Sequence, residues 1–312
     1  MSEKQKYRLV TRSDFDGLVC AMLLKELNMI NDILFVQPKD MQDGKIDVTV
    51  NDISTNLPYT PGLHLSFDHH GSDNIRLGDN VHESRINDPS ALSAARVVYE
   101  HFGGGEVFSS DWDEVMAAVD KADSAQFIDD DILYPKGWML MNFLMDPRTG
   151  LGRFREFTIS NYQLMMKLID FCREHPIEEV LALPDIKERV DYYFEQEEMF
   201  KTQIQTRTKI QDNLAIMDLR GDDIIFPGNR FMIYALYPQC NISMHILWGK
   251  ERNITVFALG RSIFDRSSNT NIGELCLKYG GGGHQGAGTC QVDTEQAFKV
   301  RKELITQINQ DG

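Results

Sequence analysis

Carboxylate and imidazole side chains follow several short apolar runs in the front part of the sequence. Such groups cost free energy when they are buried without partners, so their position at the ends of strand-like runs favours a binding site over a hydrophobic core. Oxygen donors together with an imidazole, and without a thiolate, are typical ligands of Mn²⁺ or Mg²⁺ rather than of zinc or copper. The sequence therefore predicts a metal site whose donors are Asp14, Asp16, Asp52, His69 and Asp123.

The elements expected to hold these donors are short strands and helices of an α/β domain. Apolar runs predict strands at 7–11, 33–36, 47–50 and 63–67. The carboxyl ends of parallel strands line one crevice, where ligands bind. Asp52 is expected at the end of the middle strand. It is the predicted bridge between two ions about 3.5–4 Å apart, an arrangement that stabilises the attacking and leaving oxygens of phosphoryl transfer.

Each motif taken alone has a structural alternative. An Asp-x-Asp turn such as Asp14 to Asp16 is usually a solvated turn or a helix cap. Asn51-Asp52 is a common turn pair, and Asp120 competes with Asp123 for the role at the end of its predicted helix. The joint pattern favours a site, because acids follow three successive strands.

The back part of the chain has a different character. Residues 138–175 are helical in pattern, and a long, polar, amphipathic helix is expected over 185–212. This predicts a parallel-sheet front domain with flanking helices over 1–184, the connecting helix, and a smaller α/β domain over 213–312 that closes over the cleft. A connecting helix permits hinge movement between two lobes. In the last domain strands are expected at 224–226, 231–237 and 253–259, and a helix at 271–279.

A run of four glycines, Gly280–Gly283, precedes His284. The run is either a flexible loop or a place where backbone N–H groups approach a phosphate to which His284 also donates. Flexible linkers usually mix in serine and other polar residues. Because this run lies between a predicted helix and a strand-like segment, phosphate binding is the preferred interpretation.

Composition and charge limit the class of substrate. The 312 residues carry a net charge of −15, and residues 1–212 hold the whole excess, with 22 Lys and Arg against 37 Asp and Glu. An acidic protein is not built to hold long duplex DNA, so an anionic substrate is expected to be small. The five scattered cysteines favour reduced thiols. Because no run resembles a signal peptide or a membrane span, we expect a cytoplasmic protein with no membrane partner.

The motifs Asp14-x-Asp16-Gly17, Asn51-Asp52, Asp68-His69-His70, Asp123 and Gly281-Gly-Gly-His284 resemble, in order and context, those of the DHH phosphoesterase family. The front domain resembles the catalytic DHH domain, and the back domain resembles the DHH-associated domain. The family includes RecJ-type exonucleases, NrnA-type oligoribonucleases, cyclic-dinucleotide phosphodiesterases and exopolyphosphatase-like proteins. The resemblance implies hydrolysis of a phosphodiester or phosphoanhydride by metal-activated water. It implies one or two Mn²⁺ ions, with Mg²⁺ or Co²⁺ as substitutes.

The resemblance also implies a role for each motif residue. Asp14 would serve a first metal, Asp16, His69 and Asp123 a second, and Asp52 would bridge the two. His70 would orient the metal cluster or touch the phosphate. Substrate phosphate would be held by Arg266, Ser267, Gly281, Gly282, Gly283 and His284.

Arg12 departs from the family pattern, because many members open the first motif with a histidine. Arginine stays protonated and cannot be a metal ligand. Three interpretations stay open: the first ion is held by fewer protein groups and more water, only one ion binds tightly, or Arg12 replaces part of the first ion's charge and clamps the phosphate.

We therefore expect a metal-dependent phosphohydrolase that acts on a dinucleotide, a short single-stranded oligonucleotide or a related nucleotide. Two alternatives are exopolyphosphatase-like activity on short polyphosphate and a non-catalytic nucleotide-binding sensor. The exact substrate, the physiological metal, the lobe arrangement and the oligomeric state, including a homodimer, stay open at this point.

Overall fold

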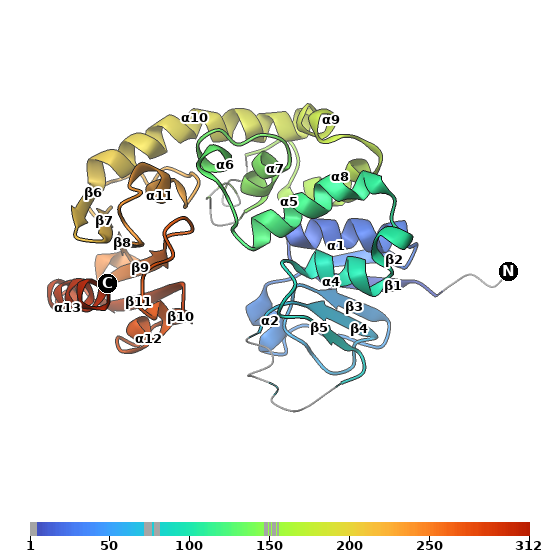
Figure 1. Ribbon diagram of the computed structural model, residues 1–312, viewed down its shortest axis with the longest axis horizontal. Helices are drawn as coiled ribbons and strands as arrows, with labels where there is room; N and C mark the ends of the chain where they lie inside the picture. Colours follow the sequence, from blue (N-terminus) through green and yellow to red (C-terminus); the bar gives the residue numbers. More distant parts are fainter. Residues whose placement is uncertain are drawn as a thin grey trace. The chain divides into compact units, whose positions relative to one another are not determined.

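The chain folds into two compact units, each with its own sheet. The computed structural model describes residues 5–71, 77, 82–146, 149, 151, 154 and 156–312. Unit 1 takes the described residues of Met1–Gln126, Lys136–Pro147 and Leu151–Asp191, and unit 2 those of Phe127–Pro135, Arg148–Gly150 and Tyr192–Gly312. The main division along the chain falls inside the long helix α10 (Pro184–Arg207), labelled in Figure 1.

Unit 1 is built on a five-stranded sheet in the order β2-β1-β3-β4-β5. Every neighbouring pair of strands is parallel, so the carboxyl ends of all five lie at one edge. The predicted parallel α/β class is therefore confirmed. The strands are β1 (Tyr7–Thr11), β2 (Ile30–Phe35), β3 (Asp52–Thr55), β4 (Leu65–Asp68) and β5 (Arg85–Asn87).

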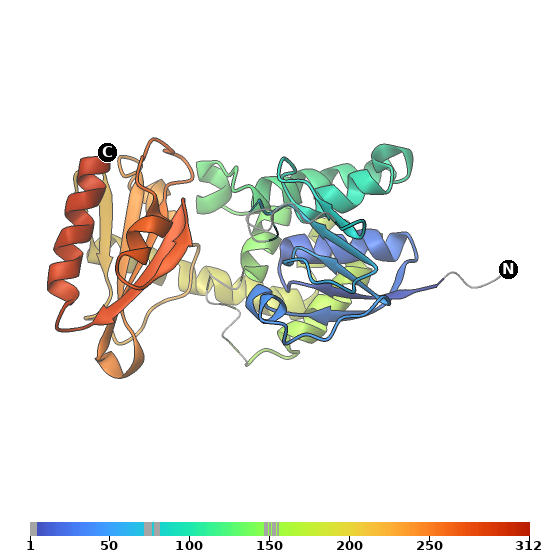
Figure 2. The same cartoon turned by 90° about the horizontal axis from the view of Figure 1, so that it is seen from below.

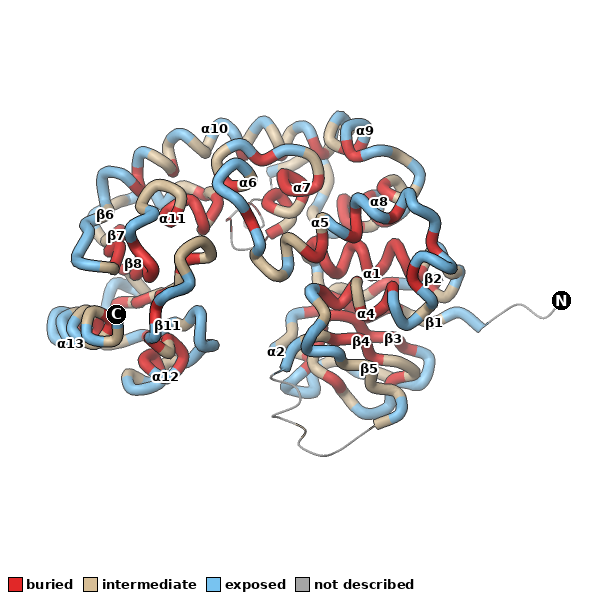
Figure 3. The backbone as a smooth tube through the Cα atoms, in the orientation of Figure 1, coloured by how far each residue is buried: buried red, intermediate tan, exposed pale blue. Residues whose placement is uncertain are grey.

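Helix α1 (Phe15–Glu26) is the centre of unit 1. Its residues from Phe15 to Leu24 are all buried, because other helices pack around it, and Figure 3 shows this as a mostly red tube. The opposite face of the sheet is covered by α2 (Pro38–Gln42), whose Met41 packs with Val10 and Leu57. The other helices of unit 1 are α4 (Ala94–His101), α5 (Asp113–Asp123), α7 (Gly137–Met145), α8 (Asn161–Glu174) and α9 (Ile177–Leu181), with 3₁₀ turns at Gly104–Glu106 and Ser110–Trp112.

Unit 2 has a six-stranded sheet in the order β10-β11-β9-β8-β7-β6, in which only β7 and β8 pair in parallel. Helix α13 runs alongside these strands in Figure 2. The strands are β6 (Thr208–Gln211), β7 (Leu214–Asp218), β8 (Ile242–Trp248), β9 (Ile254–Arg261), β10 (Gly282–His284) and β11 (Ala287–Asp293). The helices are α6 (Asp129–Leu133), α11 (Met232–Leu236), α12 (Ile272–Leu277) and α13 (Ala297–Asp311), with a 3₁₀ turn at Lys250–Arg252.

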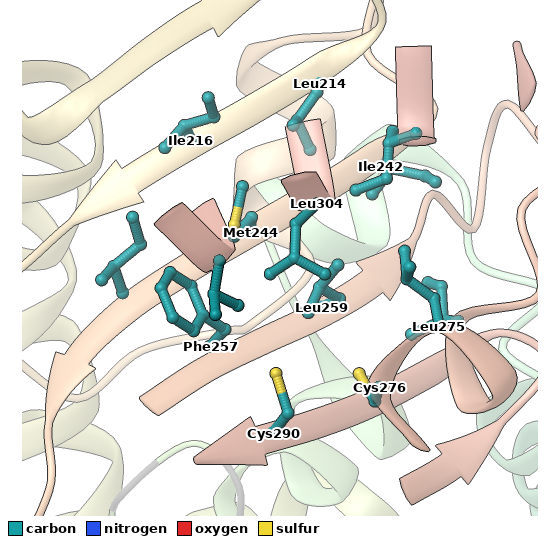
Figure 4. Packing of buried hydrophobic residues seen from close by; sticks show 14 of the residues in the cluster. Leu214, Ile216, Ile242, Met244, Phe257, Leu259, Leu275, Cys276, Cys290 and Leu304 are labelled. Carbon is teal, nitrogen blue, oxygen red and sulfur yellow. The ribbon is translucent and has the colours of Figure 1, made fainter. Parts of the chain in front are cut away.

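The core of unit 2 follows from the two periodicities of its elements. Alternate strand residues such as Met244 and Ile246 face one side. They meet Val300, Leu304 and Ile308, which recur every fourth residue along α13. Figure 4 shows this packing and also places Cys276 and Cys290 next to each other beneath it.

Several predicted strands differ from the structure. No strand forms at 47–50, because Asp52 accepts the N–H of Thr49 and folds this segment into a turn ahead of β3. Residues 224–226 are irregular. The predicted strand at 231–237 is the helix α11, in which Met232, Ile233 and Tyr234 are buried in succession rather than alternately. Among the described residues no helix has the length and apolarity needed to cross a membrane.

Candidate metal centre and active site

The turn between β1 and α1 carries the first predicted motif. Gly17 is required by space, since a Cβ there would lie 2.1 Å from the carbonyl oxygen of Arg12. Asp14 caps α1, because its Oδ1 accepts the N–H of Gly17 at 3.0 Å. Its Oδ2 lies 3.0 Å from Nε of Arg12. The capping interpretation is thus correct for Asp14, and its negative charge is balanced by the arginine within the same turn.

Asp16 is held by the start of another helix. It is 2% exposed, and its two oxygens accept the N–H groups of Ala94 and Ala95 at 3.0 and 2.8 Å. These N–H groups belong to the first turn of α4, the positive end of the helix dipole. Burial raises the pKa of Asp16 well above its ordinary value, and the charges of Asp123 and Asp14 raise it further.

His69 follows β4, Asp123 ends α5, and the two side chains meet. Nε2 of His69 lies 2.8 Å from Oδ2 of Asp123. Nδ1 of His69 lies 3.2 Å from the carbonyl oxygen of Ala91. Because a carbonyl only accepts, Nδ1 carries a hydrogen, and Nε2 of the neutral ring presents its lone pair. Burial lowers the pKa of His69, but the close carboxylate of Asp123, with the charge of Asp16, outweighs it and raises the pKa to about 9.

Asp16, His69 and Asp123 fit a divalent cation. One ligand atom from each lies within 4.8 Å of the others. Nε2 of His69 is buried and makes no well-aligned hydrogen bond within the described part of the chain, although Asp123 is close. At this spacing the carboxylates of Asp16 and Asp123 repel each other when both are ionised, and a bound cation removes that repulsion. The structure thus brings together three of the five predicted donors.

Asp120 belongs to a second layer around this centre. It is buried and accepts from the hydroxyl of Ser93 at 2.7 Å and from Nε and Nη2 of Arg96 at 2.9 and 2.7 Å. These bonds join α5, which carries Asp123, to the start of α4, which holds Asp16. The competition between Asp120 and Asp123 is therefore resolved by position: Asp120 ties the two helices together, and Asp123 faces the centre.

His70 lies beside the metal centre but does not join it. Its Nδ1 is 2.8 Å from Oδ1 of Asp68, the last residue of β4, and its ring meets that of His69 edge-on at 4.5 Å between centroids. The side chain is 44% exposed. Asp68 therefore orients a histidine ring that solvent or a substrate can reach.

The expected position of Asp52 is wrong. Asp52 is the first residue of β3, not the residue that follows a strand, so it lies about 10 Å of strand length from the carboxyl edge. Its Oδ1 accepts from Nε of Arg8 at 2.6 Å, and its Oδ2 accepts from the backbone and hydroxyl of Thr49 at 2.6 and 3.0 Å. Asp52 joins β1 to the turn before β3 and cannot bridge ions at the opposite edge.

Asn56 occupies the carboxyl end of β3 instead, and the sequence reasoning missed it. It is 1% exposed, with a left-handed φ of 55°, which asparagine tolerates well. Its Nδ2 donates to Oδ1 of Asp14 at 3.3 Å, and its Oδ1 is buried with no hydrogen-bond partner among the described residues. The sequence signal for Asn56 is that it directly follows the short run Asp52–Thr55. This signal was overlooked because the strand was predicted at 47–50 instead.

The second half of the glycine run, Gly282 and Gly283, belongs to strand β10, and Gly281 directly precedes it. A Cβ on Gly281 would lie 2.1 Å from the carbonyl oxygen of Thr289, and one on Gly283 would lie 2.2 Å from that of Ala287. These two glycines are therefore needed for close contact between β10 and β11. Gly282, in contrast, is exposed and has open space around its Cβ position.

The remaining predicted substrate residues are at the surface of unit 2. His284 ends β10 and is exposed. Arg266 and Ser267 are exposed in the segment after β9, where Nε of Arg266 donates to the carbonyl of Ile263 and the Ser267 hydroxyl accepts from Asn241. Their proposed role in phosphate binding stays a prediction.

The chain belongs to the DHH phosphoesterase family and is a phosphoesterase. It is similar to the pGpG-specific phosphodiesterase PggH from Vibrio cholerae, with 59% identity and a TM-score of 0.90 over 98% of this chain and 100% of that one. Its fold resembles RecJ from Thermus thermophilus, solved with Mn²⁺ and with Mg²⁺. The RecJ identities are 12% and 13%, and the TM-scores are 0.56 and 0.52, over 98% of this chain and 52% and 50% of RecJ. No protein-family model and no curated protein matches the chain.

Replacing Asp52 tests its corrected role. We expect Asp52→Asn to keep metal binding and activity but to lower the free energy of unfolding by about 1–3 kcal/mol, because Arg8 and the N–H of Thr49 lose a charged acceptor. Chemical denaturation beside metal titration measures both. Loss of metal binding in a folded variant would restore Asp52 to the site.

The stability that Asp52 contributes should depend on pH. Burial alone would raise the pKa of Asp52, but the bonds from Arg8 and Thr49 outweigh it and lower the pKa. A lowered folded-state pKa stabilises the protein above the ordinary carboxyl range, and this stabilisation is lost as the pH falls through the folded-state pKa. The stability difference between wild type and Asp52→Asn should therefore be largest at neutral pH and shrink in acid.

Substitutions at the adjacent Gly281 and Gly282 compare a closely packed glycine with an exposed one. We expect Gly281→Ala to destabilise the protein by about 1–3 kcal/mol, because its methyl group collides with backbone that cannot move freely. Gly282→Ala is the matched control, with the same added group in open space and no expected loss of stability. Equal melting temperatures for the two variants would contradict the assignment.

Proposed function

We propose that this protein is a divalent-metal-dependent phosphodiesterase that hydrolyses the linear dinucleotide pGpG to two molecules of GMP. The observation that carries the proposal is the 59% identity to a pGpG-specific phosphodiesterase over nearly all of both chains. In this reaction water adds to the internal phosphorus and the bond from phosphorus to the ribose 3′ oxygen breaks. The 3′ oxygen leaves as a hydroxyl, and the second nucleotide keeps the phosphate as a monoester.

Asp16, His69 and Asp123 are the residues that would hold the cation, which we propose to be Mn²⁺. When bound there, the cation would offset phosphate charge and lower the pKa of water. Asp16 is fixed by the start of α4 and His69 by the carbonyl of Ala91, so both donors are oriented before anything binds. His70, oriented by Asp68, is the candidate to exchange a proton with the departing ribose oxygen.

The contacts of Arg12 favour a metal centre that holds one ion tightly. Asp14, the expected ligand of a first metal, already has Arg12 on one oxygen and Gly17 and Asn56 on the other. The described donor cluster contains Asp16, His69 and Asp123, but not Asp14. Of the three interpretations of Arg12, we favour the one in which its guanidinium replaces charge from a first ion and donates to the scissile phosphate.

Unit 2 would contribute binding of a substrate phosphate. His284 is exposed at the end of β10, and Gly282, next but one along the strand, leaves its backbone open. We retain His284, Gly282, Arg266 and Ser267 as the proposed phosphate-binding residues. Gly281 and Gly283 would support them by permitting the close β10–β11 contact.

A substrate panel with Mn²⁺ tests the proposed reaction. We expect GMP from pGpG, and no phosphate release from short polyphosphate, because the proposed reaction breaks a diester. Asp123→Asn should lower kcat/KM roughly 100-fold or more, the scale on which loss of one electrostatic group reduces catalysis. The matched control is Asp111→Asn, which changes an exposed acid just before α5, the helix that Asp123 ends. Its kcat/KM should equal that of the wild type.

Other results of the panel would contradict the proposal in different ways. Tight binding of pGpG without turnover in Mn²⁺, Mg²⁺ or Co²⁺ would identify a nucleotide sensor. Release of phosphate from polyphosphate at a higher rate than GMP from pGpG would identify an exopolyphosphatase-like enzyme.

Metal stoichiometry tests the role of Arg12 without any assay of turnover. We expect wild type and Arg12→Ala to bind one Mn²⁺ per chain in calorimetry and elemental analysis. Arg12→His should bind two, because an imidazole beside the released Asp14 restores a ligand pair. Two ions in the wild type, or one in Arg12→His, would show that Arg12 does not determine the stoichiometry.

A further inference from the structure

A pocket lies inside unit 1, beside the turn that follows β1. Its volume is about 260 Å³, and helices α7 and α8 and the start of α10 supply most of its wall. This is below the roughly 300 Å³ at which pockets for drug-sized ligands begin, so it suits one ring system rather than a whole nucleotide. Its apolar lining includes Met141, Met145, Met165, Leu168 and Phe157.

Two polar residues of the lining place the pocket next to the candidate active site. Ser13 stands between Arg12 and Asp14, and Gln37 follows β2, the strand beside β1. Both are exposed, whereas Met165 and Leu168 are buried, so the pocket leads from the carboxyl edge of the sheet into apolar surroundings. The metal-ligand cluster uses the same edge, so pocket and cluster are connected through a single turn.

Arg189 indicates that the ligand of this pocket is uncharged. It is 4% exposed, and its Nη1 donates to the carbonyl of Asp185 and to Glu188 at 2.7 and 3.0 Å. Nη2 donates to the carbonyl of Ile159 and to Oδ1 of Asn161 at 2.8 and 3.0 Å. Since Glu188 balances its charge and these donors are occupied, the guanidinium is not available to hold a phosphate.

The other contacts favour a flat aromatic ligand. Methionine sulfur makes favourable contacts with aromatic rings, and the pocket has three methionines. The guanidinium of Arg189 already lies 4.1 Å from the centre of the Phe157 ring, which gives the pocket a planar wall. The amide of Gln37, the Nδ2 group of Asn161 and the hydroxyl of Ser13 offer donors and acceptors of the kind that a base edge pairs with.

We propose that this pocket binds one guanine base of the substrate and thereby selects a dinucleotide over phosphodiesters without a base. The inference rests on the proposed function and deepens it. The base would enter between Ser13 and Gln37, and the attached phosphate would then lie at the turn that carries Arg12. A site that hydrogen-bonds a substrate group rejects an analogue that lacks it, because its polar groups are left unpaired.

A tryptophan in the pocket wall tests this proposal. Met165→Trp fills the volume, and we expect the ratio of kcat/KM for pGpG to that for bis(4-nitrophenyl) phosphate, a diester without a nucleobase, to fall at least tenfold through KM. Tyr162→Trp is the matched control: it lies on the same helix, is 52% exposed, and should keep the wild-type ratio. A folded Met165→Trp variant with the wild-type ratio overturns the proposal and identifies the pocket as a packing void.

Two measurements keep the test decisive if the variant does not fold or if pGpG is not the substrate. With wild-type protein, replacing each base of pGpG in turn by hydrogen should raise KM at least tenfold for one position; equal KM values overturn the proposal.

Calorimetric titration with guanosine, which has no phosphate, needs no turnover. Binding by wild type that Met165→Trp weakens at least tenfold supports the pocket, and the absence of guanosine binding overturns it. Failure of the proposed function itself appears separately, as no GMP from pGpG.

Discussion

The geometry of the centre depends on one buried carboxylate, that of Asp16. The residue belongs to the first turn of α1, yet its two oxygens accept backbone N–H groups from the start of α4. This joins the turn after β1 to the helix that follows β5, across most of the sheet. Burying a charged group is costly without such partners, so the interaction fixes the positions of both elements. The Asp120–Arg96 ion pair then connects α4 to α5 and places Asp123 opposite Asp16.

The two carboxylates of the turn after β1 are balanced in different ways. Arg12 and Asp14 form an ion pair, while Asp16, Asp123 and His69 form a cluster whose repulsion only a proton or a cation relieves. The two halves of the motif Asp14-x-Asp16 therefore differ in character although they are two residues apart. The charge of Asp14 is neutralised by Arg12, whereas Asp16 belongs to a cluster that can bind a cation. The guanidinium also puts a permanent positive charge at the edge where an anionic substrate would bind.

The sequence was informative where chemistry and local pattern agreed. Strand β1 lies where its apolar run predicted it. Asp16 and His69 follow strands that end at one sheet edge, and the end of α5 brings Asp123 to them. Asp52 was misplaced because β-branched residues before it look like a strand, and only the tertiary contact with Arg8 shows that the strand begins there. Asn56 escaped notice for the same reason, since its role depends on strand register. Helix α11 was wrongly predicted as a strand. Its residues are buried in succession, so the segment has no alternation of polar and apolar residues that would distinguish a strand from a helix.

The carboxyl edge of unit 1 combines two different environments. Charged groups gather after β1 and β4, whereas the turns that follow β1 and β2 border a methionine-lined pocket whose single guanidinium is already neutralised. Ser13 belongs to both, because it separates Arg12 from Asp14 and lines the pocket. A substrate with one charged linkage and one neutral ring matches this arrangement, since each part meets the environment that costs least to desolvate. Selection of the ring and chemistry at the linkage then rest on different residues, so either property can change through substitutions that leave the other intact.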